Sequence, residues 1–172
     1  MPLSNVGAVV NLIQGYVASE FSTATYNTNQ GLSLFPELIQ RIASRNDLTG
    51  KTLKVTSPAD FDGTNDVDVS STAAILLGFV MGTNATATED FALLFYNTIT
   101  PVEGTTLYQA MLDVPAAATK ATGRVLCAVY PEPVEFATAL SYSVVQNGAD
   151  LDIEGTLLGT ANGERIMVVY AN

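Results

Sequence analysis

The densest group of side chains able to do chemistry is a run of aspartates between two apolar segments. Asp60, Asp62, Asp66 and Asp68 place four carboxylates close together in the segment Asp60-Phe-Asp-Gly-Thr-Asn-Asp-Val-Asp68. Calcium prefers carboxylate and carbonyl oxygens, so this segment is a candidate calcium site. It lacks the glycine at loop position six and the distal glutamate of an EF-hand loop. A solvated turn between strands is therefore the favoured interpretation.

A second acidic group has a period of two residues. Asp150, Asp152 and Glu154 alternate with apolar or small residues, which on a strand puts all three on one face. Exposure to solvent explains this pattern without a ligand. We predict no catalytic residue, no cofactor and no metal centre apart from the calcium candidate.

Residue types missing from the chain exclude several reaction classes. Histidine is absent, which rules out Ser-His-Asp and Cys-His mechanisms and removes the commonest metal ligand. A carboxylate pair acting in acid–base catalysis stays formally possible, but such glycosidase sites are normally combined with aromatic residues that stack on sugars. Tryptophan is also absent. We therefore predict that the chain is not an enzyme.

Composition points to contacts with protein rather than with phosphate. The 172 residues carry a net charge of −10 with only seven basic residues, so no basic patch is available for nucleic acid. Charged residues make up 14%, against about 25% in typical domains. A charge-poor exterior rich in Thr, Ser, Asn and Ala can pack closely against other protein. An assembly component fits this composition.

Neither a membrane segment nor a disulfide is predicted. No stretch approaches about 18 uninterrupted apolar residues, and the N-terminus has no basic segment followed by a long apolar run. We expect a soluble protein with no secretion signal and no membrane partner. The single cysteine, Cys127, lies in the apolar run Val125–Tyr130 and should behave as a small buried hydrophobe.

The first 50 residues have a helical rhythm. Apolar residues from Val6 to Val17 recur at intervals of three and four, which predicts a helix near residues 6–19 with Asn5 as its N-cap. Pro36 fits the first turn of a second helix that continues through Ile42. Gly50 closes this region. We predict a partly helical N-terminal arm over residues 1–50, used for anchoring or oligomerisation.

From Lys51 onward the apolar residues form short runs separated by turn residues, which predicts strands. The predicted strands are 53–56, 67–70, 75–81, 91–96, 106–114, 124–130, 140–145, 151–156 and 165–170. The Asn147-Gly148 and Asn162-Gly163 pairs predict tight hairpin turns. Residues 51–172 should form one domain, so the fold class is mainly β: an antiparallel β-sandwich or jelly roll with a partly helical N-terminal arm.

The glycines and tyrosines in and between these strands are expected to have structural roles. Gly78, Gly82 and Gly104 are too dispersed for a phosphate-binding loop and are assigned to turns or close packing. The strand tyrosines are expected to pack across strands in the core or at an interface; they are Tyr96, Tyr108, Tyr130, Tyr142 and Tyr170.

Several segments together resemble a strand pattern found in phage virion proteins. These segments are Ala74–Asn84, Phe91–Asn97, Val102–Thr106, Asp113–Pro115, Tyr130–Phe136, Leu140–Val144 and a closing strand that ends at Tyr170. The pattern consists of a strand ending in an asparagine turn, an aromatic edge strand, a Gly-Thr turn and a Val-Pro exit. It covers about residues 53–172. Ala139-Leu140 stands where glycine is usual in such proteins.

The resemblance implies a non-catalytic structural protein of a phage virion, most similar to capsid decoration or cement proteins. Such a protein would sit on the outer capsid surface, bind the major capsid protein and stabilise the shell. Symmetric sites on a capsid favour a closed homo-oligomer such as a trimer. The alternative is a receptor- or glycan-binding domain of a spike or tail fibre, because jelly rolls also serve lectins.

Overall fold

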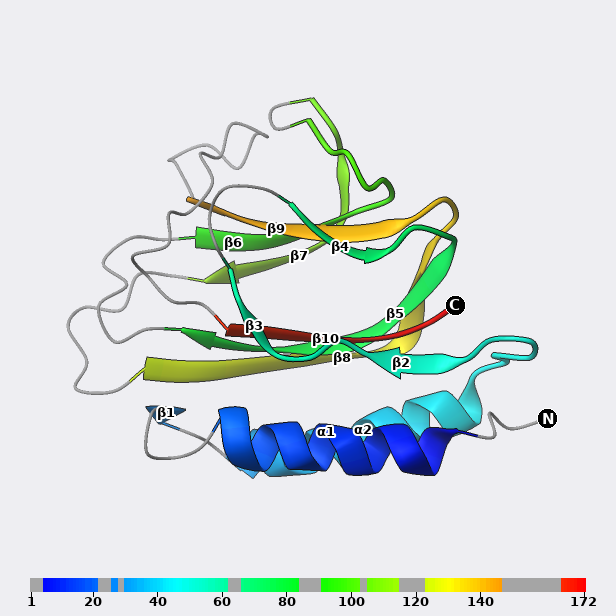
Figure 1. The fold of residues 1–172 in the computed structure, drawn as a ribbon, viewed down its shortest axis with the longest axis vertical. Helices are drawn as coiled ribbons and strands as arrows, with labels where there is room; N and C mark the ends of the chain where they lie inside the picture. The colour runs from blue at the N-terminus through cyan, green and yellow to red at the C-terminus, as the bar shows by residue number, and fades with distance from the viewer. Residues whose placement is uncertain are drawn as a thin grey trace.

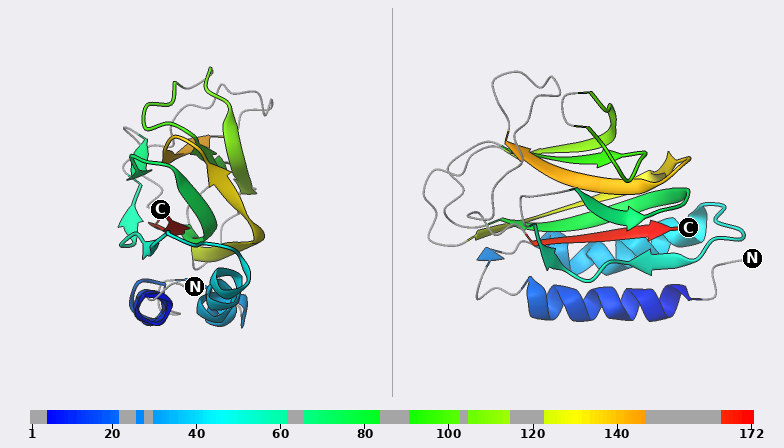
Figure 2. Two further views of the ribbon diagram at one scale, coloured as in Figure 1. Left: turned by 90° about the vertical axis from the view of Figure 1, so that its right-hand side faces the viewer. Right: turned by 45° about the horizontal axis from the view of Figure 1, so that its top comes forward.

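Two β-sheets packed face to face, with two helices laid over one of them, form the fold (Figure 1). The structure is a computed structural model that describes residues 5–21, 26–27, 30–61, 66–83, 91–102, 105–114, 123–146 and 165–172. The layers run in the order helices, sheet A, sheet B, as Figure 2 also shows. The predicted β-sandwich is confirmed.

Each sheet is built from strands that are distant in sequence. Sheet A has the order β1-β8-β5-β10-β2, with β3 also paired to β10, and sheet B has the order β4-β9-β6-β7. The strands are β1 Tyr26–Asn27, β2 Leu53–Val55, β3 Ala59–Asp60, β4 Val67–Ser70, β5 Ala74–Thr83, β6 Phe91–Tyr96, β7 Tyr108–Val114, β8 Gly123–Phe136, β9 Leu140–Gln146 and β10 Arg165–Ala171. The β1–β8 pair is parallel and the other pairs are antiparallel.

The strand pairs are nested. β6 pairs with β7, β5 with β8, β4 with β9 and β2 with β10. The chain from β2 to β10 is thus one long antiparallel ribbon that wraps around itself, with its paired strands falling alternately in the two sheets. This is the jelly-roll topology, which decides between the two alternatives that the sequence left open.

A core of aromatic and aliphatic side chains lies between the two sheets. Phe79 of sheet A meets Phe95 of sheet B with ring centroids 5.3 Å apart, and Phe95 lies 6.1 Å from Tyr142. All three side chains are buried. Tyr96 and Tyr170 are buried too, and Tyr130 packs against the core from a partly buried position, as the sequence predicted for these tyrosines.

The helices cover the outer face of sheet A. Helix α1 spans Val6–Glu20 and α2 spans Gln30–Arg45. Their apolar faces share a second buried cluster with the outward side chains of sheet A, in which Ile13, Phe35 and Ile39 are fully buried. The helical region is therefore a packed layer of the fold. Neither helix is long and apolar enough to cross a membrane.

Two details of the helices differ from the sequence-based prediction. Asn5 occupies the N-cap position of α1 but makes no capping hydrogen bond, because its amide donates to the carbonyl of Leu53 at 2.6 Å and ties the helix to β2. Pro36 lies inside α2 rather than in its first turn. The helix begins earlier because Leu32 and Phe35 are buried against the rest of the fold.

Strand β8 continues past its predicted end at Tyr130, through two prolines, to Phe136. The β5–β8 register shifts between Leu76 and Gly78, so residues 130–133 bulge out of the pairing. Proline is tolerated at such bulges because no ladder hydrogen bond is required from it there. The predicted strand 151–156 and the two Asn-Gly turns lie outside the described residues.

Candidate contact surfaces

The described aspartates of the calcium candidate do not all lie in one sheet. Asp60 lies on β3 in sheet A and forms an ion pair with Arg165, with Oδ1 2.8 Å from Nε. Asp68 lies in β4 of sheet B, and Asp66 directly precedes that strand. Asp62 is outside the described residues. Within the described ranges, no group of three or more His, Cys, Asp or Glu residues could hold a metal ion. The calcium site stays a prediction, as does the second acidic group, which also lies outside these ranges.

Asp66 is the aspartate with the most unusual environment. Partial burial raises the pKa of its carboxyl, and a hydrogen bond from Ser143 acts in the opposite direction. Its Oδ1 is buried without a hydrogen-bond partner among the described residues. The Ser143 hydroxyl also lies 3.3 Å from that of Tyr96. These groups form a small polar cluster in sheet B that is better suited to a neutral Asp66 than to a charged one.

We predict that Asp66→Asn stabilises the protein at neutral pH. Because the pKa of Asp66 is raised in the folded state, the stability linked to this group is complete at acidic pH and declines as the pH rises through the folded pKa. An asparagine at position 66 does not ionise, so the protein does not lose this stability as the pH rises. The gain should be below about 1 kcal/mol, since solvent screens a partly exposed carboxyl.

Urea unfolding at about pH 3 and about pH 7, on either side of the ordinary aspartate pKa, measures this effect. Glu135→Gln serves as the control because it removes an exposed carboxylate from β8 in the other sheet. A loss of stability at pH 7 in Asp66→Asn would contradict the interpretation that burial disfavours the charged form of Asp66.

Arg165 links the helical layer to sheet A. Its guanidinium forms ion pairs with Glu20 at the end of α1 and with Asp60 on β3. The three residues come from distant parts of the chain, so sequence spacing gave no signal for the cluster. Its role is structural, because the pairs join one helix to two strands.

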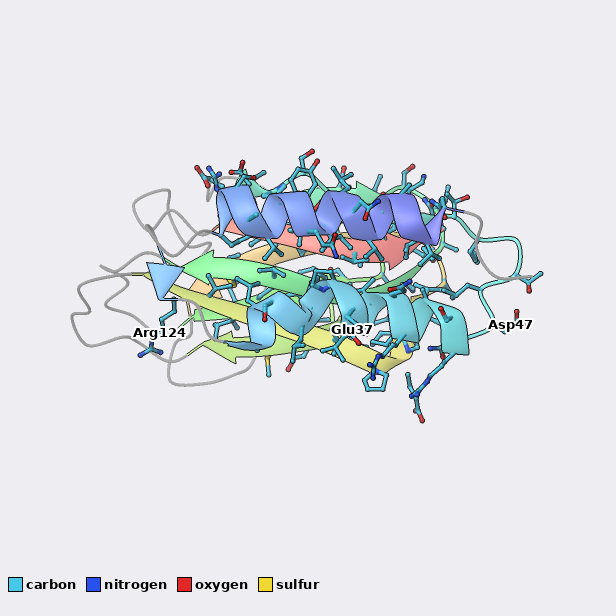
Figure 3. All side chains as sticks on the ribbon, turned by 90° about the horizontal axis from the view of Figure 1, so that it is seen from below. Glu37, Asp47 and Arg124 are labelled. Atoms are coloured by element: carbon cyan, nitrogen blue, oxygen red, sulfur yellow. The ribbon has the colours of Figure 1, made fainter. Side chains whose placement is uncertain are left out.

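The outer faces of the two helices differ in character, although the helices lie side by side on sheet A (Figure 3). Helix α2 is amphipathic, and its exposed face carries Glu37, labelled in Figure 3, in an ion pair with Arg41. Helix α1 has no charged residue before Glu20. Its exposed residues are Gly7, Ala8, Asn11, Leu12, Gln14, Gly15, Ala18 and Ser19. The solvent-facing side of α1 is therefore uncharged.

Charge is unevenly divided along the chain. Residues 1–54 contain four basic and three acidic residues, a net charge of +1. The remaining residues carry a net −11, which together with the +1 gives the total of −10. The helical layer is thus close to neutral, and the acidic charge belongs to the sandwich.

A second candidate contact surface, with exposed apolar side chains, lies on the opposite side of the molecule. The β6–β7 loop, residues 97–107, rises from sheet B on the side away from the helices (Figures 1 and 2). Within it Val102 is 61% exposed and Leu107 is 72% exposed. Residues 103 and 104 lie outside the described part of the chain. Large apolar side chains this exposed are typical of contact surfaces when they cluster.

Hydrogen bonds fix the described residues of the β6–β7 loop on either side of positions 103 and 104. The Val102 carbonyl accepts from the amides of Thr105 and Thr106, and the Val102 amide donates to Thr106 Oγ1 at 2.8 Å. At the base, Asn97 Oδ1 accepts from the Thr138 amide at 2.8 Å. The apolar side chains are therefore presented by a pre-ordered loop, which lowers the entropy lost on binding.

Sequence reasoning missed both surfaces as contact sites. The segment Val102–Thr106 was noted only as a Gly-Thr turn, and α1 only as a helix with an apolar period. The available signals were the absence of charge through residues 1–19 and the apolar Val102 and Leu107 flanking a turn. Cys127, by contrast, is half-buried in the second cluster, where burial raises the pKa of its thiol, so a packing role fits.

Comparisons with known proteins give little further information. No family model and no curated protein matches the chain. Among solved structures, a chain of the empty capsid of Triatoma virus is similar, with 16% sequence identity and a TM-score of 0.23. The similarity covers 72% of this chain and 83% of the capsid chain. A TM-score this low does not establish a common fold.

Proposed function

We propose that the chain is a non-catalytic structural protein of a virus particle, a decoration or cement protein that binds the outer capsid shell. Bound at junctions between capsomers, it would bury additional interface and so oppose internal pressure. Its partner would be the major capsid protein, and its action would be adhesion without turnover.

The β6–β7 loop is the observation that carries this proposal. A rigid loop that holds two large apolar side chains in water has no role in the core, but it provides a ready contact for another protein. Burying a valine and a leucine would contribute about 1.5–3 kcal/mol each to such a contact.

The fold and the composition give further support. Jelly rolls serve as building blocks of viral capsid and lectin domains, although a fold alone does not determine function. The low proportion of charged residues favours close packing on a protein lattice. The absence of histidine removes the side chain that most often acts as a catalytic base.

We predict that the double variant Val102→Ser with Leu107→Ser binds virus particles at least about tenfold more weakly, because it removes the apolar area that would be buried. Co-sedimentation with particles prepared without the protein measures this. Leu34→Ser is the matched control, since Leu34 is 51% exposed on α2, on the opposite side of the molecule. Equal binding by the loop variant and the unmodified protein would refute the assignment of the loop as the shell contact.

A further inference from the structure

We infer that the outer face of α1 is a self-association surface, where α1 of a second copy packs across a two-fold axis. This inference concerns the isolated protein and does not depend on the proposed function. It rests on the contrast between the two helices, on the distribution of charge and on the space above α1.

The contrast between the helices indicates that α1 is covered. A helix that is apolar around its whole circumference is normally buried on all sides, whereas a helix at the surface has a polar outer face. Helix α2 follows the second pattern, with Glu37 and Arg41 exposed to solvent. Helix α1 departs from both patterns: its uncovered outer side carries no charged residue and combines small residues with the uncharged polar residues Asn11, Gln14 and Ser19. Leu12 is 45% exposed on this side.

The charge distribution identifies a second copy as the occupant. Two copies of net charge −10 repel each other, so they associate most easily where the charge between them is smallest. Contact through α1 brings together the two nearly neutral helical layers and places the two acidic sandwiches on opposite outer sides. Contact through sheet B would bring the acidic parts together.

The space above α1 permits close helix packing. A Cβ atom added at Gly7 or Gly15 would meet nothing within 4 Å. Glycine inside a helix makes the helix less stable than alanine would. A second helix that approaches the backbone closely at Gly15 offsets this cost, because its side chains can fill the space that a larger residue would occupy.

The size of the surface predicts a weak dimer. A 15-residue helix is about 22 Å long and about 10 Å wide, so its outer half offers on the order of 350 Å². Two such surfaces bury about 700 Å², less than a standard stable interface. The dimer should therefore form only at high protein concentration, or where copies are held close together. A two-fold dimer also differs from the trimer expected from capsid symmetry.

Sedimentation equilibrium between about 10 µM and about 1 mM tests this inference, and we expect reversible dimers in the upper part of that range. Leu12→Glu adds a negative charge to each copy at the contact and should weaken the dimer at least about tenfold. Ser44→Glu, which adds the same charge to the exposed face of α2, should leave it unchanged. Purely monomeric protein, trimers, or a dimer insensitive to Leu12→Glu would overturn the inference.

A crosslinking experiment tests the same interface with a variant that does not place a charge on α1, so that an effect of Leu12→Glu on folding is distinguished from an effect on the dimer. Asn11→Cys places a thiol in the middle of the proposed contact, close enough to its symmetry mate for a disulfide under mild oxidation. Ser44→Cys on α2 is the matched control. Disulfide-linked dimers in Asn11→Cys alone are the expected result. Equal crosslinking of both variants, or of neither, would contradict an interface at α1.

Discussion

Replacing Phe95 with alanine should lower the free energy of unfolding by about 3–5 kcal/mol, the usual cost of removing a fully buried phenylalanine. The Phe95 side chain is completely buried between the sheets. Its ring contacts Phe79 of sheet A, with 5.3 Å between ring centroids, and Tyr142 of sheet B. The variant would therefore leave a cavity where the two halves of the jelly roll meet.

Urea unfolding followed by far-ultraviolet circular dichroism measures this loss. Ile99→Ala is a suitable control, because Ile99 is exposed in the β6–β7 loop and its replacement should change stability by no more than about 0.5 kcal/mol. If Phe95→Ala cost less than about 1.5 kcal/mol, the packing of the two sheets through Phe79 and Phe95 would be wrong.

Gly78→Ala should destabilise the protein by about 3 kcal/mol, although it adds only one methyl group. A Cβ at position 78 would lie 2.6 Å from the carbonyl oxygen of Ala128, 3.1 Å from Ile39 Cδ1 and 3.3 Å from Phe35 Cε2. The carbonyl belongs to β8, the strand paired with β5, so it cannot move without disturbing the sheet. Overpacking of a core commonly costs about 1–3 kcal/mol, and a clash with backbone lies at the upper end.

Gly15→Ala provides the opposite control in the same urea experiment. Nothing lies within 4 Å of a Cβ at position 15, and alanine is the better helix former, so this variant should gain about 0.5–1 kcal/mol. Both variants should be compared in dilute protein, where α1 has no partner helix. A neutral effect of Gly78→Ala would contradict the close approach of the Ala128 carbonyl and of α2 to β5 at this point.

The sequence predicted the strands better than their connections. The sequence pattern identified β4 and β6 to the residue and β2 to within one residue, because each is short and bounded by turn residues. The end of β8 was missed because two prolines normally stop a strand, and only the bulge opposite β5 makes them acceptable. A bulge depends on the partner strand, which the local sequence does not contain.

The placement of the helical layer and of the contact surfaces could not be predicted from the local sequence either. The period of α1 predicted which residues face inward, but not that they cover sheet A instead of forming a separate arm. Asn5 appeared to be a helix cap, yet its amide bonds to Leu53, 48 residues away. The placement of Asp60 and Asp68 in different sheets also follows from strand topology. Each of these features depends on contacts between distant segments.

A cryo-electron microscopy reconstruction of the virus particle tests the proposed function most directly. Density for this jelly roll at regular positions between capsomers, with the β6–β7 loop against the shell, is the predicted result. Density confined to a vertex or tail would contradict the decoration role and favour a spike or receptor-binding protein. Absence of density from the particle would refute a structural role in the virion.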